Sequence, residues 1–411
     1  MQEENLSGEE LDIDISSEYA ELETVLVHRP GREIERVLPS NKDYLLFDDI
    51  PFLQTMQKEH DLFVETLTKH CDCQVLYIEK LLEDIICDEQ IRKKLVTEIV
   101  SEEKCRGLEE YLNKIDDNEL INTIFCGITF DEWANVIGKR PRFRERFIMP
   151  PIPNAYFVRD PAAIIKDTIA ACKMHFDVRV RESIILRCIF KWHPLFKKKN
   201  KFCYGITTDE DRPFTVEGGD ITVINRNAIA IGWSQRTTPD AIEKVAVNLF
   251  GKGIIDRVYE IKIPSSRAYM HLDTVFTIVG PNVVVVYPDV IDEEIETSIY
   301  TPTKIYGQVK AHLSENITTN FISYLETELG KPLKIVKTGD GSLTEAEREQ
   351  WADGTNVLAI SPNKVITYDR NVLTNEALTK AGVNVITVPG TELVRGRGGP
   401  RCMTLPIKRK T

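Results

Sequence analysis

Near the C-terminal end of the 411-residue chain, residues 395–402 read RGRGGPRC and place a single cysteine after three glycines and three arginines. A thiol reacts as a nucleophile only when it is a thiolate, so a catalytic cysteine needs a nearby positive charge that lowers its pKa. The glycines predict a turn whose backbone comes close to a ligand. Cys402 is therefore a candidate nucleophile, although a lone cysteine is more often a small buried apolar side chain.

Other polar clusters lie beside apolar segments elsewhere in the chain. EGGD at 217–220 and MHLD at 270–273 each precede an apolar segment, and NAYFVRD at 154–160 carries an amide and a carboxylate. If MHLD is extended, His271 and Asp273 point to one face of a strand. The pair could also bind a metal, but the further histidine and cysteine ligands of a zinc site do not accompany it.

Each candidate also has an ordinary structural explanation. Glu217 could be a turn acid, His271 a buried core histidine, and Asp160 the ion-pair partner of its neighbour. Together, however, the candidates supply a thiol, an imidazole and three carboxylates, with arginines at 179 and 236. Carboxylates that converge bind a planar guanidinium, and arginines in the same pocket recognise an anion. Free arginine carries both groups and fits such a site.

The elements that must position these residues form a repeat. Residues 221–232, 275–288 and 356–369 each show apolar alternation, a short polar turn and a second apolar run, which predicts a β-hairpin. Residues 157–172 fit a fourth hairpin. The repeating unit is ββαβ, because a helical pattern and a lone strand follow each hairpin. Such units pack as a ring or a stack, and in a ring their equivalent strand ends would meet at a common centre.

The helical patterns lie in four regions. Those that follow the hairpins are expected over 237–250, 304–330 and 375–382, the first with Thr238 as N-cap. Between about 55 and 148, apolar residues at helical spacing alternate with charged residues, and there is little strand signal. This region is predicted to be an inserted bundle of several helices.

Composition excludes several classes of protein. The formal net charge of -12 argues against a nucleic-acid partner, because phosphate recognition relies on clustered Lys and Arg. The most hydrophobic segment is broken by Gly280 and Pro281, so we expect no membrane span and, by elimination, a cytoplasmic protein. Nine cysteines without regular spacing indicate reduced thiols, and Cys87, Cys126 and Cys188 are expected to be small apolar packing residues.

Several motifs together resemble one family. They are HRPGREIERVLPSNKDYLLFDDIP, NAYFVRDP, DVRVRES, VEGGD, SQRTTP, MHLDTVFT, EREQWADGTN, YDRN and RGRGGPRCM. From about residue 20 to the end, their order and number resemble the arginine deiminase family of the guanidine-modifying enzymes. The resemblance implies a five-fold pseudosymmetric α/β propeller of ββαβ modules. It would be a single catalytic domain over 1–411, with an inserted helical subdomain at 55–148.

The resemblance implies five catalytic residues. Cys402 would attack the guanidinium carbon. His271 would protonate the departing ammonia and then activate water. Glu217 would bind the guanidinium beside His271 and help to move protons, while Asp160 and Asp273 would hold the guanidinium nitrogens. These groups would hydrolyse free L-arginine to citrulline and ammonia through an S-alkylthiouronium on Cys402, with water as co-substrate and without a metal or organic cofactor.

The resemblance also implies five substrate-binding residues. Asn154, Arg179 and Arg236 would hold the amino-acid end of the substrate, Phe157 would form an apolar wall, and Arg397 would be a mobile arginine of the cysteine loop. Two positions depart from the expected pattern. Gln235 stands where many relatives are expected to carry an acid, and Arg181 lies close enough to Arg179 to leave that assignment open. A homo-oligomer, dimeric or larger, is expected by the same resemblance.

Other functions remain open from the sequence. An amidinotransferase or a dimethylarginine hydrolase could use the same thiol, imidazole and carboxylates, but explains less well the two arginines combined with the helical insert. A peptidyl-arginine deiminase is disfavoured, since those arginines would exclude a peptide backbone. An RNA-binding protein could use RGRGG, which the acidity of the chain disfavours. A catalytically silent relative is disfavoured by the complete set of candidate residues.

Overall fold

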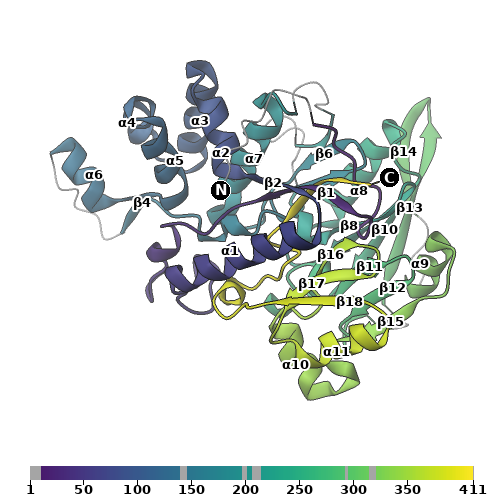
Figure 1. The fold of residues 1–411 in the computed structure, drawn as a ribbon. Helices are drawn as coiled ribbons and strands as arrows, with labels where there is room; N and C mark the ends of the chain where they lie inside the picture. Colours follow the sequence, from purple (N-terminus) through teal and green to yellow (C-terminus); the bar gives the residue numbers. More distant parts are fainter. Residues whose placement is uncertain are drawn as a thin grey trace.

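The computed structural model describes residues 11–138, 146–196, 201–205, 214–291, 295–313 and 321–410. The described chain is a mixed α/β structure in which small sheets occupy the centre and one side, and a group of helices occupies the other side (Figure 1). In the same ranges, no helix combines the length and the apolarity needed to cross a membrane.

Most of the sheets share one arrangement. Two strands pair antiparallel, and a third strand, reached through a helix, pairs parallel to the second. The strands, each group with its helix, are β5 (Ala162–Ile165), β6 (Thr168–Ala171), α7 (Val180–Trp192) and β7 (Phe202–Tyr204); β8 (Ile221–Asn225), β9 (Ala228–Trp233), α8 (Pro239–Gly251) and β10 (Arg257–Lys262); β11 (Phe276–Gly280), β12 (Val283–Val286), α9 (Phe321–Leu329) and β15 (Lys334–Lys337); β16 (Leu358–Ser361), β17 (Lys364–Tyr368), α11 (Val372–Lys380) and β18 (Asn384–Val388). These four groups confirm the four predicted hairpins and the ββαβ order.

The two ends of the chain complete a further sheet of this kind. β19 (Leu405–Arg409) pairs antiparallel with β1 (Leu22–Val27), and β1 pairs parallel with β2 (Gln74–Tyr77) through α1 (Leu53–His70). This pairing places the strand that follows Cys402 inside the core. The sheets are separate among the described strands and none closes on itself, so the ring arrangement stays a prediction.

The apolar pattern explains why these segments form buried strands. β12 consists of four valines, all buried, and β-branched side chains suit the pleated surface of a sheet. Its neighbour β11 is buried along its full length. Strands buried on both faces read as continuous apolar runs rather than as an alternation. These central strands therefore form a rigid support for the loops at their ends.

Five further helices follow β2. They are α2 (Ile78–Ile86), α3 (Glu89–Glu102), α4 (Glu109–Lys114), α5 (Asp117–Cys126) and α6 (Phe130–Ile137), and they lie together on one side of the molecule (Figure 1). Thr129 and Glu132 form a capping box that starts α6. The predicted helical region of 55–148 also includes most of α1, which links β1 to β2.

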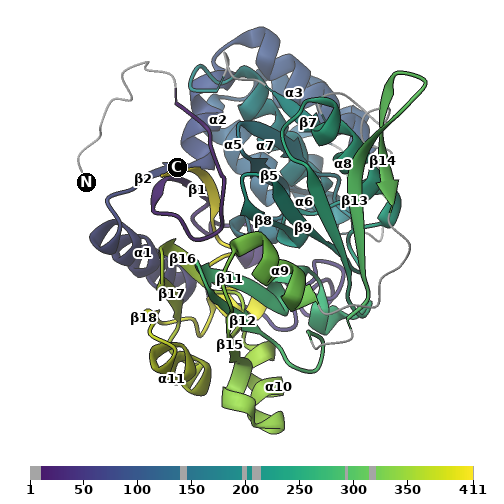
Figure 2. The ribbon, with the colours of Figure 1, turned by 90° about the vertical axis from the view of Figure 1, so that its right-hand side faces the viewer.

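The helix expected over 304–330 is wrong in its first part. Residues Thr297–Ile305 and Gln308–Leu313 form an antiparallel hairpin, β13 and β14, and only α9 is helical. Tyr306 and Gly307 both have positive φ, which is the geometry of a two-residue type I′ hairpin turn. Figure 2 shows this hairpin projecting from the edge of the sheet that contains β10.

The C-terminal segment and the cysteines show two further features. In the basic segment 408–410, Arg409 is buried and donates hydrogen bonds to the carbonyl oxygens of Ala20 and Ala359. All nine cysteines are free thiols, as predicted. Cys87, however, is exposed at the end of α2 rather than packed, because it lies on the outer side of the helix group, whereas Cys126 and Cys188 are buried.

The remaining α-helix of the described chain is α10 (Leu343–Trp351).

Candidate active site

Cys402 lies in the loop between Leu393–Gly396, a short 3-10 turn, and β19, and its side chain is buried. The side-chain oxygen of Asn356 fixes this loop, because it accepts hydrogen bonds from the backbone N–H of Cys402 at 2.9 Å and of Gly399 at 3.1 Å. A Cβ at position 399 would lie 2.4 Å from the Asn356 carbonyl oxygen. The RGRGG segment is therefore a closely packed turn. Glycine is required at position 399, where the loop packs against Asn356, which lies just before β16.

Asp273 lies next to the thiol. Its Oδ2 is 3.5 Å from the Cys402 Sγ and 2.6 Å from the Arg401 guanidinium. The other oxygen, Oδ1, is buried and has no hydrogen-bond partner among the described residues. Asp273 can therefore accept a hydrogen bond from a ligand that lies against the sulfur.

His271 lies between two acids. Its Nε2 is 2.7 Å from Glu217 Oε2, and its Nδ1 is 3.6 Å from Asp160 Oδ1. A Cβ at Gly219 would lie 2.6 Å from this Nδ1, so only glycine allows the imidazole to occupy this position. The expectation that 271–273 is a strand is wrong, because Leu272–Thr274 is a 3-10 turn that aims His271 and Asp273 separately.

Two arginines pair with these acids. Arg179 is 2.6 Å from Asp160 Oδ2, and it also pairs with Glu182 at 2.7 Å. Arg236 is 3.3 Å from Glu217 Oε2. The acid of the 154–160 motif thus pairs with Arg179 and not with its neighbour in sequence. All five side chains are buried, so they form a charged network that is closed to bulk water.

The structure decides between the two neighbouring arginines of the DVRVRES motif. Arg181 binds Glu103, the residue that follows α3, and donates hydrogen bonds to the carbonyl oxygens of Ile124 and Pro150. It ties α7 to the helix group. Arg179, which precedes α7, is the residue that faces the carboxylates.

The electrostatics of the site follow from burial and from these neighbours. Burial alone would lower the pKa of His271, but the carboxylates of Asp160 and Glu217 raise it to about 9. Burial would raise the pKa of Glu217, but Arg236 and His271 lower it well below its usual range. Burial and the nearby Asp273 and Asp160 raise the pKa of the Cys402 thiol well above its usual value. These shifts favour a neutral Cys402 thiol and a protonated His271 imidazole near neutral pH.

Asp160, Glu217 and His271 each offer one ligand atom, and these atoms lie within 4.8 Å of one another. Three such donors could hold a divalent metal. Glu217 and His271 already hydrogen bond to each other, however, and Arg236 and Arg179 neutralise the carboxylates. The arrangement fits a network of ion pairs better than a metal centre.

The remaining predicted residues flank the network. Asn154 donates a hydrogen bond to the Leu45 carbonyl at 2.7 Å, and Phe157 packs beneath the cysteine loop, where a Cβ at Gly398 would lie 2.3 Å from its ring. Arg397 lies apart from the acids. It has left-handed φ and stacks on Trp351, with its guanidinium carbon 3.5 Å from the ring centroid.

Two functional positions were missed from the sequence. Asp220 accepts hydrogen bonds from the Leu272 N–H at 2.8 Å and from the hydroxyls of Ser234 and Thr237 at 2.7 and 2.6 Å, and so it holds the turn that carries His271. Asn356, which holds the cysteine loop, is the other. Both lie in motifs that were recognised, EGGD and EREQWADGTN, but their partners are remote in sequence.

Comparison with known proteins identifies the family of this chain. A family model described as arginine deiminase matches residues 43–409. The chain belongs to the arginine deiminase family. It is 41% identical over 411 residues to the arginine deiminase of Oenococcus oeni, covering 97% of each chain, and 38% identical to arginine deiminase 1 of Staphylococcus epidermidis, covering 97% of this chain and 98% of the relative. The resemblance read from the motifs is confirmed.

Solved structures with a similar fold share a much lower sequence identity with this chain than the named arginine deiminases do. SxtG, an amidinotransferase from Microseira wollei, has a TM-score of 0.58 at 16% identity and covers 97% of this chain and 98% of its own. DDAH from Pseudomonas aeruginosa, in a complex with citrulline, has a TM-score of 0.52 at 14% identity and covers 94% and 99%. At this identity they support the mixed α/β fold and nothing more specific.

Proposed function

We propose that this member of the arginine deiminase family hydrolyses free L-arginine to L-citrulline and ammonia. The observation that carries the proposal is the position of the buried Cys402 thiol, whose sulfur is 3.5 Å from Asp273. Burial, Asp273 and Asp160 together raise the pKa of this thiol, and Asp160 in turn lies 3.6 Å from the His271 ring. Full-length relatives named arginine deiminase support the same reaction. An RNA-binding role for RGRGG is disfavoured further, because Arg397 in this segment is buried.

The free oxygens of the carboxylates support guanidinium binding. Asp160 Oδ1 and Asp273 Oδ1 are buried and accept no hydrogen bond within the described chain. A buried carboxylate oxygen without a donor is costly, and a guanidinium supplies up to five N–H donors in one plane. The substrate head group would thus satisfy both acids at once, with its central carbon next to the Cys402 sulfur.

The arginines support binding of the other end of the substrate. In the ligand-free site, Arg179 and Arg236 neutralise Asp160 and Glu217. When the substrate guanidinium takes over these carboxylates, the two arginines become available for the α-carboxylate. Asn154 lies beside Arg179, whose Nη2 is 3.5 Å from the Asn154 carbonyl oxygen. Phe157 would cover the alkyl chain, and Arg397 would swing inward from Trp351.

The chemistry follows from the resting charges. The bound guanidinium adds a positive charge beside the neutral thiol, which lowers the pKa of Cys402 so that the thiol loses its proton to solvent water. The sulfur then attacks the guanidinium carbon, and the protonated His271 gives its proton to the amino group that leaves as ammonia. Neutral His271 next takes a proton from water. The resulting hydroxide adds to the carbon of the S-alkylthiouronium. The C–S bond then breaks, the hydroxyl proton of the intermediate passes to the departing thiolate and restores the thiol, and neutral citrulline is released.

Several wider features belong to the same proposal. The sheets would form a five-fold pseudosymmetric propeller, so that residues 1–411 make one catalytic domain with a helical subdomain at 55–148. The protein would work in the cytoplasm as a homo-oligomer, dimeric or larger, without a metal or organic cofactor. Light scattering of the purified protein measures the mass of the assembly, and extensive dialysis against a chelator tests the requirement for a metal.

A direct assay tests the reaction. The protein is offered L-arginine, a methylated arginine, or arginine with glycine as acceptor, and citrulline, methylamines and transferred amidino groups are quantified. We expect citrulline and ammonia in equal amounts from L-arginine, and none from the Cys402→Ser variant. Transfer to glycine, or preferential release of methylamines, would instead assign an amidinotransferase or a dimethylarginine hydrolase.

A further inference from the structure

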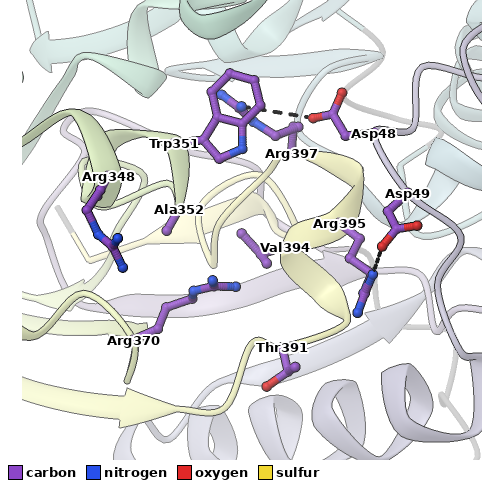
Figure 3. Close-up of a pocket in the computed structure, with 10 residues that line it drawn as sticks. All are labelled: Asp48, Asp49, Arg348, Trp351, Ala352, Arg370, Thr391, Val394, Arg395 and Arg397. Atoms are coloured by element: carbon purple, nitrogen blue, oxygen red, sulfur yellow. Dashed lines mark hydrogen bonds and ion pairs between the residues drawn. The ribbon is translucent and has the colours of Figure 1, made fainter.

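A pocket of about 350 Å³ lies next to the cysteine loop (Figure 3). Residues with no part in the proposed chemistry help to build it: Arg348 and Trp351 come from the EREQWADGTN motif, and Arg370 comes from YDRN. The cysteine loop contributes Arg395 and Arg397. Four arginines from three separate segments therefore line one cavity in a chain whose net charge is -12.

The two acids of the pocket do not neutralise all four arginines. Asp49 pairs with Arg395, and Asp48 accepts a hydrogen bond from Arg267 at 2.8 Å. Arg348 lies at the rim and is exposed. The lining carries four positive and two negative side chains, and Glu345 and Glu392, outside the lining, pair with Arg348 and Arg395. Among the described residues, neither Arg370 nor Arg397 has a carboxylate at hydrogen-bonding distance.

Arg397 is the group that needs a ligand. It is 4% exposed, and its Nε, Nη1 and Nη2 have no hydrogen-bond partner within the described residues. Asp48 is 4.0 Å from Nη1, an ion-pair distance that lies beyond hydrogen-bonding range. Burial lowers the pKa of Arg397, and the carboxylates of Asp353 and Asp48 oppose this shift without accepting a hydrogen bond from its guanidinium. Its stacking on Trp351 occupies the face of the guanidinium but leaves the N–H edge free, which is the edge that binds an oxyanion with two parallel hydrogen bonds.

Arg370 supplies the second cation of the pocket. It lies two residues after Tyr368, the last residue of β17, and its exposed side chain extends into the pocket (Figure 3). The buried Asp353 is the nearby acid whose pKa Arg370 and Arg397 both lower, against the larger effect of burial, which raises it.

We propose that this pocket binds a phosphate-class oxyanion between Arg370 and Arg397. The oxygens of such an anion can accept hydrogen bonds from the unpartnered N–H groups of Arg397, and the guanidinium of Arg370, from a different element, can hold the anion from a second side. An anion bound here keeps Arg397 stacked on Trp351 and away from the substrate. Because Arg397 has a substrate-binding role in the proposed function, and the second half of this inference rests on it, the anion should compete with arginine.

Binding is measured first, without arginine. Inorganic phosphate, methyl phosphate and acetate are titrated by calorimetry into the purified protein at constant ionic strength. We expect saturable binding of inorganic phosphate, at least about tenfold weaker binding of acetate, and at least about tenfold weaker phosphate binding by Arg370→Ala, since a charge-assisted hydrogen bond is lost. Equal binding of methyl phosphate would extend the site to phosphorylated metabolites, and its exclusion would restrict the site to the free ion.

The matched control is Arg32→Ala, which removes an exposed arginine with an (i, i+3) glutamate partner outside the pocket. It should leave phosphate binding unchanged. Absence of saturable binding, equal binding of acetate, or equal losses in the two variants would overturn the site.

Kinetics then test the consequence. Phosphate should raise KM for arginine without changing kcat, and Arg370→Ala should remove this effect while keeping turnover without phosphate. Phosphate binding that leaves KM unchanged would overturn the competition. A protein that binds phosphate through Arg370 but does not hydrolyse arginine would refute the proposed function and leave the anion site standing.

Discussion

Glu217→Gln isolates the charge that sets the protonation of His271. Glutamine keeps the size and the hydrogen-bond acceptor of glutamate but removes its negative charge. Glu217 contacts His271 at 2.7 Å and Arg236 at 3.3 Å in a fully buried site. The substitution should therefore change the pKa of His271 and the stability of the protein in predictable directions.

The magnitude follows from the pKa of His271, which is raised from 6.5 to about 9. This difference corresponds to about 3 kcal/mol of preference for the protonated imidazole. Asp160 and Glu217 share the effect, so removal of the Glu217 charge should lower the pKa of His271 by about 1 unit. The substitution leaves His271 and Arg236 buried without the charge of Glu217. The free energy of unfolding should therefore also fall by about 3 kcal/mol or more near pH 7.

The sign of the pH dependence is fixed by the raised pKa. Protonated His271 stabilises the fold fully below pH 6.5, and this contribution is lost as the pH rises through about 9. The same proton is needed for the departure of ammonia, so kcat/KM should decline through the same alkaline range. In Glu217→Gln both declines should begin at lower pH.

The assay is the pH profile of kcat/KM together with an NMR titration of His271. The control is Glu328→Gln, which alters a buried carboxylate that bonds Tyr259 at 2.6 Å and Arg257 at 3.0 Å, far from the site in the fold. The control should lower stability without moving the alkaline limb. An alkaline limb at the same pH in Glu217→Gln and the parent protein would refute the reasoning about His271.

Other substitutions test separate parts of the site. Cys402→Ser should abolish turnover while the circular dichroism spectrum and Tm change little, because the hydroxyl fits the same space; measurable citrulline formation would count against the thiol. Alkylation of Cys402 by iodoacetamide should be slow at pH 7 in the free protein, because the thiol is neutral, and a thiolate already present would contradict the raised pKa. Gly219→Ala should reduce kcat at least about a hundredfold, because a Cβ 2.6 Å from the His271 ring displaces it by an amount that disrupts alignment; unchanged kcat would show that the imidazole can move without loss. Asn356→Ala should destabilise the cysteine loop and lower kcat, since two buried N–H groups lose their acceptor, with the loss read by hydrogen exchange at Gly399.

The sequence predicted the repeated elements well because their signals are local. Apolar alternation around short polar turns identified the hairpins, including the all-valine strand β12. The β13–β14 hairpin was missed because its turn, Tyr306-Gly307, lacks the usual asparagine or aspartate, although both residues adopt positive φ. The apolar residues of β13 and β14 also fit the spacing of a helix. The pairing of β13 with β10 is what makes this segment a strand.

The candidate site was predictable in its residue types and not in its contacts. The motifs favoured Arg179 but left Arg181 as an alternative, and the packing of Arg181 against Glu103, just after α3, separates them. The pairing of Arg179 with Asp160, and of Arg236 with Glu217, could not be read from spacing, because each pair joins different elements. Burial of Arg409 had the same cause, since its partners lie at the opposite end of the chain and in β16.

The covalent role of Cys402 can be tested by mass spectrometry. The protein is mixed with L-arginine, quenched in acid during turnover and digested, and the peptide that contains Cys402 is weighed. We predict that this peptide gains the mass of arginine less one ammonia, and that the gain is absent from Cys402→Ser. Steady turnover with no adduct on Cys402, or an adduct on a different cysteine, would contradict the central claim.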